Sequence, residues 1–519
     1  MHAPKPKWLN DAVFYNIYPQ SFYDSNGDGI GDLKGIAAKL DYVQEMGYTA
    51  IWLNPIFVSP FRDAGYDITD FYKVAPRYGT NEDFAALAAE AKKRGIKVVL
   101  DLVAGHTSLE CEWFQQSAKP EKNQYTNRYV WSNSVWDTDG NALISGYSDR
   151  DGCYMKNFFY CQPALNYGFK VITRPWQLPM DHPDCLATRE ELLNVMRFWS
   201  ALGADGFRVD LASSLVKNDP DGEGIIELWN DVIGRYKAEY PDNVLIAEWC
   251  HPKRAIRAGF DIDFLIHSGL KAYTTLFRYE RGTSVNDEFN SGNSYFRRAG
   301  KGGLTEFLNE YLEHYNATKA DGYISIPTGN HDIPRLSLLR DAEELKAAMV
   351  FLLTMPGVPL VYYGDEIGMR YVEGLSSKEG GFNRTGSRTP MQWESGKNHG
   401  FSTSDTPYLP TDPTEAAPTV AAQRNDPHSL LSLTKTLIAL RKAHPALMAD
   451  SVFDVVHTDY PFVYKRTAAD ETVVVAVNPS DATQTVEIPT PGEVLLQSGV
   501  TVENGTATFG AVSYIVYKI

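Results

Sequence analysis

The chain has 519 residues, which is long enough for a large central domain with further domains attached to it. Its 49 basic and 65 acidic residues leave a net charge of −16, which disfavours nucleic acid and anionic membranes as partners because both are bound by clustered Lys and Arg. Hydrophobic residues at 43% and charged residues at 22% exclude a wholly disordered chain. Aromatic residues make up 12%, which fits core packing and also fits a polar cleft lined by rings.

The cysteines indicate no metal or disulfide chemistry. They are odd in number and lack CxxC spacing, so neither a disulfide framework nor a zinc site is predicted for Cys111, Cys153, Cys161, Cys185 and Cys250. The N-terminal residues contain no apolar run of signal-peptide length, and no stretch approaches the roughly 20 apolar residues of a membrane helix. We therefore expect a cytoplasmic location.

Short apolar runs alternate with helical patterns along most of the chain. Strands are expected at 13–18, 50–53, 97–103, 206–210, 244–248, 263–266, 323–326 and 358–363, with helices at 33–46, 81–94, 188–202 and 225–239. This alternation favours a parallel sheet with helical crossovers, and about eight such units favour a closed barrel. The predicted fold class is therefore α/β, a (β/α)8 TIM barrel formed by residues 1–106 and 176–446.

Two regions depart from the barrel pattern. Residues 107–175 are rich in Tyr, Asn and Gly with few helical patterns, and are predicted to form a subdomain inserted after the third strand. After an amphipathic helix at 430–444, short alternating runs at 452–456, 462–465, 472–477 and 514–518 predict a C-terminal antiparallel β-sandwich domain at 447–519.

Polar side chains follow four of the predicted barrel strands, where the functional residues of such a barrel lie. They are Asp101 with His106, Arg208 with Asp210, Glu248, and His331 with Asp332. Arg208 and Asp210 are two positions apart and share a face, so the guanidinium should lower the pKa of Asp210 and keep it ionised. Partial burial beside Trp249 should raise the pKa of Glu248. One ionised and one protonated carboxyl at a barrel mouth predict a glycosidase pair. Any one of these residues alone is better explained as a solvated loop charge or as a member of an ion pair, but four strand ends of this kind together are not.

Four motifs in order carry a family resemblance: DLVAGH (101–106), GFRVD (206–210), IAEW (246–249) and GNHD (329–332). The chain resembles the α-amylase family, glycoside hydrolase family 13. The resemblance implies that Asp210 is the nucleophile, Glu248 the general acid/base and Asp332 a third carboxylate that binds ring hydroxyls. It also implies that Arg208 orients Asp210, and that His106 and His331 bind the sugar in subsite −1.

Further stretches are similar to one branch of that family, which holds oligo-1,6-glucosidases, maltases, dextran glucosidases and trehalose synthases. They are SFYDSNGDGIGDL (21–33), GYDI (65–68), QPALN (162–166) and RTPMQW (388–393). In these relatives an Asp before GYD pairs with the Arg of RTPMQW, which implies that Asp63 and Arg388 close the far side of subsite −1. Tyr66 would lie against the glucose ring. Such a closed end implies release of single glucose units from the non-reducing end.

Three positions depart from the patterns of the family. Gly105 stands where many secreted relatives have an Asn that helps ligate calcium between the barrel and the inserted domain. Ala164 stands where an Asp is common, and Leu211 matches neither the Val of α-1,6-acting members nor the small residue or Thr of α-1,4-acting ones. Linkage specificity therefore stays open.

An acidic, glycine-rich loop precedes the second strand. Oxygen donors recur at alternate positions, and they resemble an EF-hand-like loop made by Asp24, Asn26, Asp28, the Ile30 carbonyl and Asp32. This pattern predicts a structural Ca²⁺, or Mg²⁺ if waters complete the shell. A Gly/Asp-rich turn without metal is the alternative.

Together these observations predict a retaining hydrolase of short α-linked gluco-oligosaccharides. It would act through a covalent β-glucosyl intermediate on Asp210, with the carboxyls of Asp210 and Glu248 about 5–5.5 Å apart. The alternatives are a transglucosidase or trehalose synthase-like isomerase at the same site, and an endo-acting α-amylase. A non-catalytic relative such as the transporter heavy chains is disfavoured because all three carboxylates are present. The expected partner is a small oligosaccharide, and the oligomeric state is left open.

Overall fold

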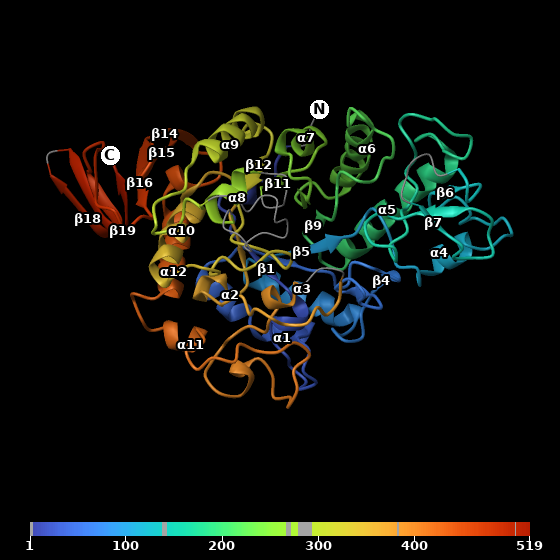
Figure 1. The fold of residues 1–519 in the computed structure, drawn as a ribbon, viewed down its shortest axis with the longest axis horizontal. Helices are drawn as coiled ribbons and strands as arrows, with labels where there is room; N and C mark the ends of the chain where they lie inside the picture. The colour runs from blue at the N-terminus through green and yellow to red at the C-terminus, as the bar shows by residue number, and fades with distance from the viewer. Residues whose placement is uncertain (1–3, 138–142, 266–270, 279–292, 381–383, 504) are drawn as a thin grey trace.

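A closed barrel of eight parallel strands forms the centre of the molecule (Figure 1). The computed structural model describes the chain except residues 1–3, 138–142, 266–270, 279–292, 381–383 and 504. The strands are adjacent in the order β12-β11-β10-β9-β5-β2-β1-β13. Backbone hydrogen bonds from Val358 N to Ile324 O (3.3 Å) and from Thr328 N to Leu360 O (3.0 Å) join the two ends of this order. The expected TIM barrel is confirmed.

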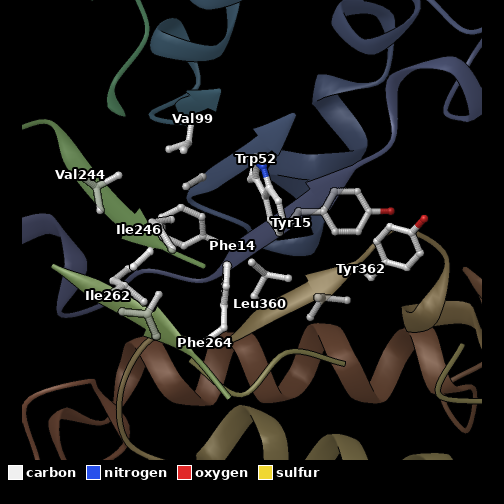
Figure 2. Packing of buried hydrophobic residues seen from close by; sticks show 14 of the residues in the cluster. Phe14, Tyr15, Trp52, Val99, Val244, Ile246, Ile262, Phe264, Leu360 and Tyr362 are labelled. Atoms are coloured by element: carbon white, nitrogen blue, oxygen red, sulfur yellow. The ribbon is translucent and has the colours of Figure 1, made fainter. Parts of the chain in front are cut away.

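The barrel strands lie close to the ranges expected from the apolar runs, although the end of the 263–266 run, Ile266, lies outside the described residues. They are β1 (Phe14–Ile17), β2 (Ala50–Leu53), β5 (Lys97–Leu102), β9 (Gly206–Val209), β10 (Val244–Ala247), β11 (Ile262–Phe264), β12 (Tyr323–Ser325) and β13 (Leu360–Tyr362). Apolar side chains of these strands, among them Phe14, Ile246, Ile262 and Leu360, pack together in the core (Figure 2). A parallel barrel buries both faces of its strands, which explains why they are continuous apolar runs.

Helices follow most of the strands. They are α1 (Leu33–Ala38), α2 (Leu40–Met46), α3 (Asn81–Lys93), α5 (Pro183–Ala201), α6 (Glu223–Glu239), α7 (Pro252–Arg257), α8 (Lys271–Phe277), α9 (Thr305–Thr318), α10 (Ala342–Thr354), α11 (Val420–Gln423) and α12 (Leu430–Ala443). Capping boxes begin α3 at Thr80 and α10 at Asp341. α5 begins earlier than expected because His182 caps it and Pro183 fits its first turn.

The single helix expected at 33–46 is two helices in the structure. Lys39 leaves the helical conformation with φ −107° and ψ 6°, and it separates α1 from α2. Its ammonium lies 4.1 Å from the centre of the Tyr23 ring and 4.4 Å from that of Trp393, and these cation–π contacts stabilise the break.

Residues between β5 and α5 form a small layer beside the barrel (Figure 1). It contains α4 (Glu112–Ser117) and a three-stranded antiparallel sheet of β6 (Trp131–Ser132), β8 (Cys153–Met155) and β7 (Leu143–Ser145). Leu165 N donates to Gly105 O at 3.0 Å, which joins this layer to the end of β5. A two-stranded ribbon, β3 (Phe57–Val58) with β4 (Asp70–Val74), follows β2.

The C-terminal part is an antiparallel sheet. Its strands are β14 (Val452–Thr458), β15 (Phe462–Ala468), β16 (Glu471–Asn478), β17 (Gln484–Glu487), β18 (Glu493–Glu503) and β19 (Thr506–Lys518). α10 contacts β16 and β19, and a second, smaller core that includes Val463, Val474 and Phe509 lies within the sheet. The sequence patterns missed β17 and β18, because β17 has no buried residue and β18 has one, Val500. No helix in the described part of the chain has the length and apolar character needed to cross a membrane.

Candidate active site

One buried arginine contacts three carboxylates at the carboxyl ends of adjacent strands. Arg208 Nη1 lies 2.8 Å from Asp101 Oδ1 and 3.1 Å from Asp210 Oδ1, and Nη2 lies 2.6 Å from Glu248 Oε1. Strand register produces this cluster, because Asp101 pairs with Arg208 across β5 and β9, and Ala247 pairs with Val209 across β9 and β10. Asp210 and Glu248 therefore leave neighbouring strands at the same height.

Gly206 allows these two strands to approach. It has φ +148°, and a Cβ at this position would lie 2.1 Å from Val244 O. A larger residue would separate the start of β9 from β10 and shift the register that places Asp210 beside Glu248.

The electrostatics of Asp210 differ from the sequence prediction, in which Arg208 lowers its pKa. Burial and, after it, the charge of Glu248 raise the pKa of Asp210 well above its usual range, and Arg208 opposes them without prevailing. Burial likewise raises the pKa of Asp101 to about 6, against the guanidinium of Arg208 and the hydroxyl of Tyr66. Asp210 and Glu248 are two interacting carboxyls, and such a pair tends to hold one proton.

The turn after Asp210 points a backbone amide at the other carboxylate. Leu211 has φ +42°, and its N–H donates to Glu248 Oε2 at 2.9 Å. Glu248 N also donates to Val209 O at 3.0 Å. The carboxyl group of Glu248 is thus held between a guanidinium and a main-chain donor.

His331 lies in a stack of rings at this end of the barrel. Its ring is parallel to those of Tyr66 and Tyr18, at centre distances of 5.2 Å and 6.2 Å. Burial lowers its pKa to about 3, so the ring is neutral near pH 7. Nδ1 then accepts from the Asn54 amide at 3.0 Å, and Nε2 donates to Asp332 Oδ2 at 3.2 Å. The hydroxyl of Tyr66 donates to Asp101 at 2.9 Å, while the predicted contact of its ring with glucose stays a prediction.

His106 is held by main-chain and amide groups. Its Nε2 lies 3.1 Å from Tyr66 O and its Nδ1 lies 3.1 Å from the Asn157 amide. Burial lowers its pKa to about 3, which again gives a neutral ring. Its predicted contact with sugar hydroxyls stays a prediction.

A lysine binds the two residues nearest to Gly105, the position at which many secreted relatives have a calcium-binding Asn. Lys217 Nζ donates to Asn157 Oδ1 at 3.0 Å and also to Ser214 O. A Cβ on Gly105 would lie 2.8 Å from the Asn157 amide, so the space that a longer side chain would need is filled. Burial lowers the pKa of Lys217 to about 8. Lys217 thus links the loop after β9 to Asn157 of the inserted layer.

The expected salt bridge between Asp63 and Arg388 is wrong, because Asp63 pairs with a different arginine. Arg384 Nη2 lies 2.7 Å from Asp63 Oδ1, and Gln162 Nε2 donates to Asp63 Oδ2 at 2.8 Å. Arg388 instead donates from Nε to His331 O at 2.8 Å and from Nη2 to Asp332 Oδ1 at 3.2 Å. The two arginines are four residues apart on a tight turn, which directs them to different partners.

Asp332 is the centre of a second group of charged residues in the site. Its Oδ1 contacts both Arg384 and Arg388, and its Oδ2 contacts His331. The third carboxylate thus lies against the cluster that holds Asp63, whereas Asp210 and Glu248 share Arg208. The structure brings together the carboxylates and basic residues predicted for the site in these two adjoining groups.

The glycine-rich loop uses its polar side chains to bind its own backbone. Asp24 accepts from Asn26 N, Gly27 N and Gly29 N at 3.1, 2.7 and 2.8 Å, and Asp32 caps α1 by accepting from Gly35 N. Oxygen donors of this kind suit a hard cation. However, among the described residues no three His, Cys, Asp or Glu side chains gather as a metal site would require.

Sequence reasoning missed several residues of the site. Arg384 lies four residues before the RTPMQW motif, and a second arginine at that spacing is the sequence feature that could have shown it. Asn54, Asn157 and Lys217 follow strands or lie in the inserted layer, and nothing in the sequence distinguishes them from other surface-loop residues. Trp52 contacts Asp101 through Nε1 at 3.2 Å, but on the sequence it is one more apolar strand residue.

The chain is similar in sequence to a known family of proteins. The model of the alpha amylase catalytic domain matches residues 16–450. The oligo-1,6-glucosidase of Parageobacillus thermoglucosidasius is 33% identical, with 93% of this chain and 92% of that protein covered. The trehalose synthase/amylase TreS of Mycobacterium tuberculosis is also 33% identical, with 85% of this chain and 76% of that protein covered.

Solved structures are similar over almost the whole chain. The isomaltulose synthase SmuA from Protaminobacter rubrum superposes with a TM-score of 0.83 at 26% identity, covering 99% of both chains. A mutant isomaltulose synthase from Erwinia rhapontici, solved with its natural substrate sucrose, superposes with a TM-score of 0.82 at 26% identity, again covering 99% of both chains.

Proposed function

Because the chain belongs to the α-amylase family and is a glycoside hydrolase of family 13, we propose that it hydrolyses short α-linked gluco-oligosaccharides with retention of anomeric configuration. The observation that carries the proposal is the placement of Asp210 and Glu248 on one guanidinium. Two carboxyls that bind one guanidinium suit the expected separation of about 5–5.5 Å, which would leave no room for a water between them and would favour the covalent route over direct attack by water.

The proposed reaction uses the two carboxyls in different protonation states. Asp210 attacks the anomeric carbon while Glu248 gives its proton to the leaving oxygen, and water then releases α-glucose with Glu248 as base. Burial and, after it, the charge of Glu248 raise the pKa of Asp210, which favours a state with one proton on the pair, and the proposed reaction places that proton on Glu248. Asp332 would bind ring hydroxyls of the glucose in subsite −1.

We further propose that the enzyme acts from the non-reducing end. Asp63 receives Arg384 from the loop after β13 and Gln162 from the inserted layer, so three separate segments meet at one carboxylate. A buried ion pair with this support would close the far side of subsite −1 and leave room for one glucose. Arg384 takes the role that the family resemblance gave to Arg388.

A second candidate function is transfer of the glucosyl group to a sugar acceptor. Relatives of similar identity are named trehalose synthase/amylase, and structures named isomaltulose synthase superpose over 99% of the chain. The same covalent intermediate would serve both outcomes, since only the attacking group differs.

One digestion series tests these proposals. The protein is incubated with maltose, isomaltose, sucrose, trehalose and maltoheptaose, and products are resolved by chromatography and by NMR in the first minutes. Glucose released as the α-anomer supports retaining hydrolysis, and a β-anomer contradicts it. Glucose and maltohexaose as the early products of maltoheptaose digestion support exo action, whereas a mixture of shorter oligosaccharides indicates an endo-acting amylase. New disaccharides indicate transfer.

We also propose that the loop of Asp24, Asn26, Asp28, the Ile30 carbonyl and Asp32 binds a structural Ca²⁺, or Mg²⁺ with added waters. The support is its set of oxygen donors around Gly27 and Gly29, both at positive φ. Such an ion would stabilise the entry into α1 and has no part in the reaction.

A further inference from the structure

A buried aspartate that no motif includes lies directly behind the proposed general acid. Asp263 is on β11, and its Cα pairs with that of Ala247, the residue before Glu248. Its side chain is fully buried. It therefore lies beside the point where the chain leaves β10 to form the catalytic end of that strand.

The carboxylate of Asp263 accepts four backbone N–H groups. Oδ1 accepts from Trp249 N at 3.1 Å, from Cys250 N at 3.2 Å and from Phe264 N at 2.9 Å, and Oδ2 accepts from His251 N at 2.7 Å. Three of these donors are the consecutive residues after Glu248. Successive amides that converge on one anion form a nest, and here the anion is supplied by the chain itself.

The turn held in this way is strained. Cys250 has φ +57°, a conformation that a residue with a Cβ adopts at some cost. His251 then caps α7 by accepting from Arg254 N. The segment thus runs from the proposed acid to a helix start through a left-handed residue, and the side chain of Asp263 is the group that binds its three amides.

We infer that Asp263 is a positioning residue that fixes Glu248 for proton donation by holding the turn after it. The inference rests on the proposed function, in which Glu248 is the general acid. Glu248 is bound on its other side by Arg208 and by Leu211 N, so a shift of the following turn would move its carboxyl relative to the leaving oxygen. Asp263 itself contacts main-chain amides of the turn and acts through them.

The dependence of rate on the leaving group separates this role from a structural one. Hydrolysis of maltose requires a general acid to protonate the leaving sugar. Hydrolysis of α-glucosyl fluoride does not, because fluoride departs without being protonated. Asp263→Asn keeps the shape but turns an NH2 group toward the turn's donors. We expect it to lower kcat/KM for maltose by about 10–100-fold, a part of the roughly 10²–10⁴-fold that general acid catalysis contributes, and that for α-glucosyl fluoride by less than about 3-fold.

Asp261→Asn is the matched control. Asp261 is also buried, lies at the other end of β11, and binds Lys237 Nζ at 2.8 Å and Leu245 N at 2.7 Å. The Asp261→Asn variant should have a lower melting temperature, while the ratio of kcat/KM for maltose to kcat/KM for α-glucosyl fluoride stays at the parental value. If Asp263→Asn lowers kcat/KM for maltose and for α-glucosyl fluoride by the same factor, Asp263 has only a structural role and the inference is overturned.

A second variant keeps the test decisive if Asp263→Asn does not fold. Adding Cys250→Gly to it removes the strain of the left-handed residue, because glycine adopts positive φ freely. The double variant should still lose more rate on maltose than on the fluoride, and a parental ratio in the folded double variant overturns the inference. A parent protein that hydrolyses neither substrate would instead contradict the proposed function.

Discussion

The two halves of the site are built in different ways. The group around Arg208 consists of residues on or directly after β5, β9 and β10, and their contacts follow from strand register. The group around Asp332 consists of residues on loops, and one of its contacts, the Asp63–Arg384 pair, joins segments more than 300 residues apart. The backbone hydrogen bonds of the barrel fix the positions of the residues on its strands. The position of each loop residue depends on the contacts of its own side chain. This difference fits the proposed roles, in which the group around Arg208 carries out the reaction and the group around Asp332 selects the substrate.

The largest expected effect concerns the strand-borne group. Asp210→Asn removes the proposed nucleophile and should lower kcat on maltose by about four orders of magnitude or more, the scale of losing a covalent nucleophile in another hydrolase. The melting temperature should stay close to the parental value, because the substitution removes the free-energy cost of burying a charged carboxyl. Steady-state kinetics and calorimetry check both. Retained turnover would show that the strand-borne group is not where the bond is broken.

The pH dependence of stability tests the residue that joins the two halves. The folded pKa of His331 is about 3, below the unfolded value of about 6.5, so the folded state binds fewer protons. Its contribution to stability is therefore complete above pH 6.5 and is lost as the pH falls toward 3. Between pH 6.5 and pH 4 this amounts to about 3 kcal/mol at 1.36 kcal/mol for each pKa unit.

His331→Gln should therefore reduce the fall in melting temperature between pH 6.5 and pH 4. The matched control is His428→Gln, at an exposed position, which should keep the parental slope. Calorimetric scans at half-unit steps measure the slopes. Equal slopes in all three proteins would mean that His331 is charged or exposed in solution.

The loop-borne group should change specificity more than rate. Arg384→Lys loses the planar contact with Asp63 and Asp332, and we expect about a 10–100-fold lower kcat/KM for maltose, the worth of a hydrogen bond to a charged group. Early maltoheptaose products should widen from glucose to mixed oligosaccharides.

Arg388→Lys sharpens this comparison. Arg388 binds His331 O and Asp332 but not Asp63, so this variant should lose activity while glucose stays the early product. Chromatography of the first products distinguishes the two variants. A wider product range from Arg388→Lys alone would restore the pairing implied by the family resemblance.

The smallest effect is expected for the glycine-rich loop of residues 24–32, which lies outside both groups and is proposed to bind Ca²⁺. Removal of a bound Ca²⁺ by a chelator should lower the melting temperature by about 2–4 °C and leave kcat unchanged. Asp28→Ala, at an exposed donor, should abolish the response to added Ca²⁺. If the parent melts at the same temperature with chelator and with Ca²⁺, the loop is a turn closed by its own amides.

The sequence by itself determined the barrel, because continuous apolar runs alternate with helical patterns and polar residues follow four of these runs. It also determined the group around Arg208, since residues that follow adjacent parallel strands meet at one edge whatever the loops do. The tertiary structure decided the partner of Asp63, because the choice between Arg384 and Arg388 depends on how a turn directs two similar side chains. It also decided the sign of the pKa shift of Asp210, because burial and a neighbouring carboxyl outweigh an adjacent arginine only once all three are placed.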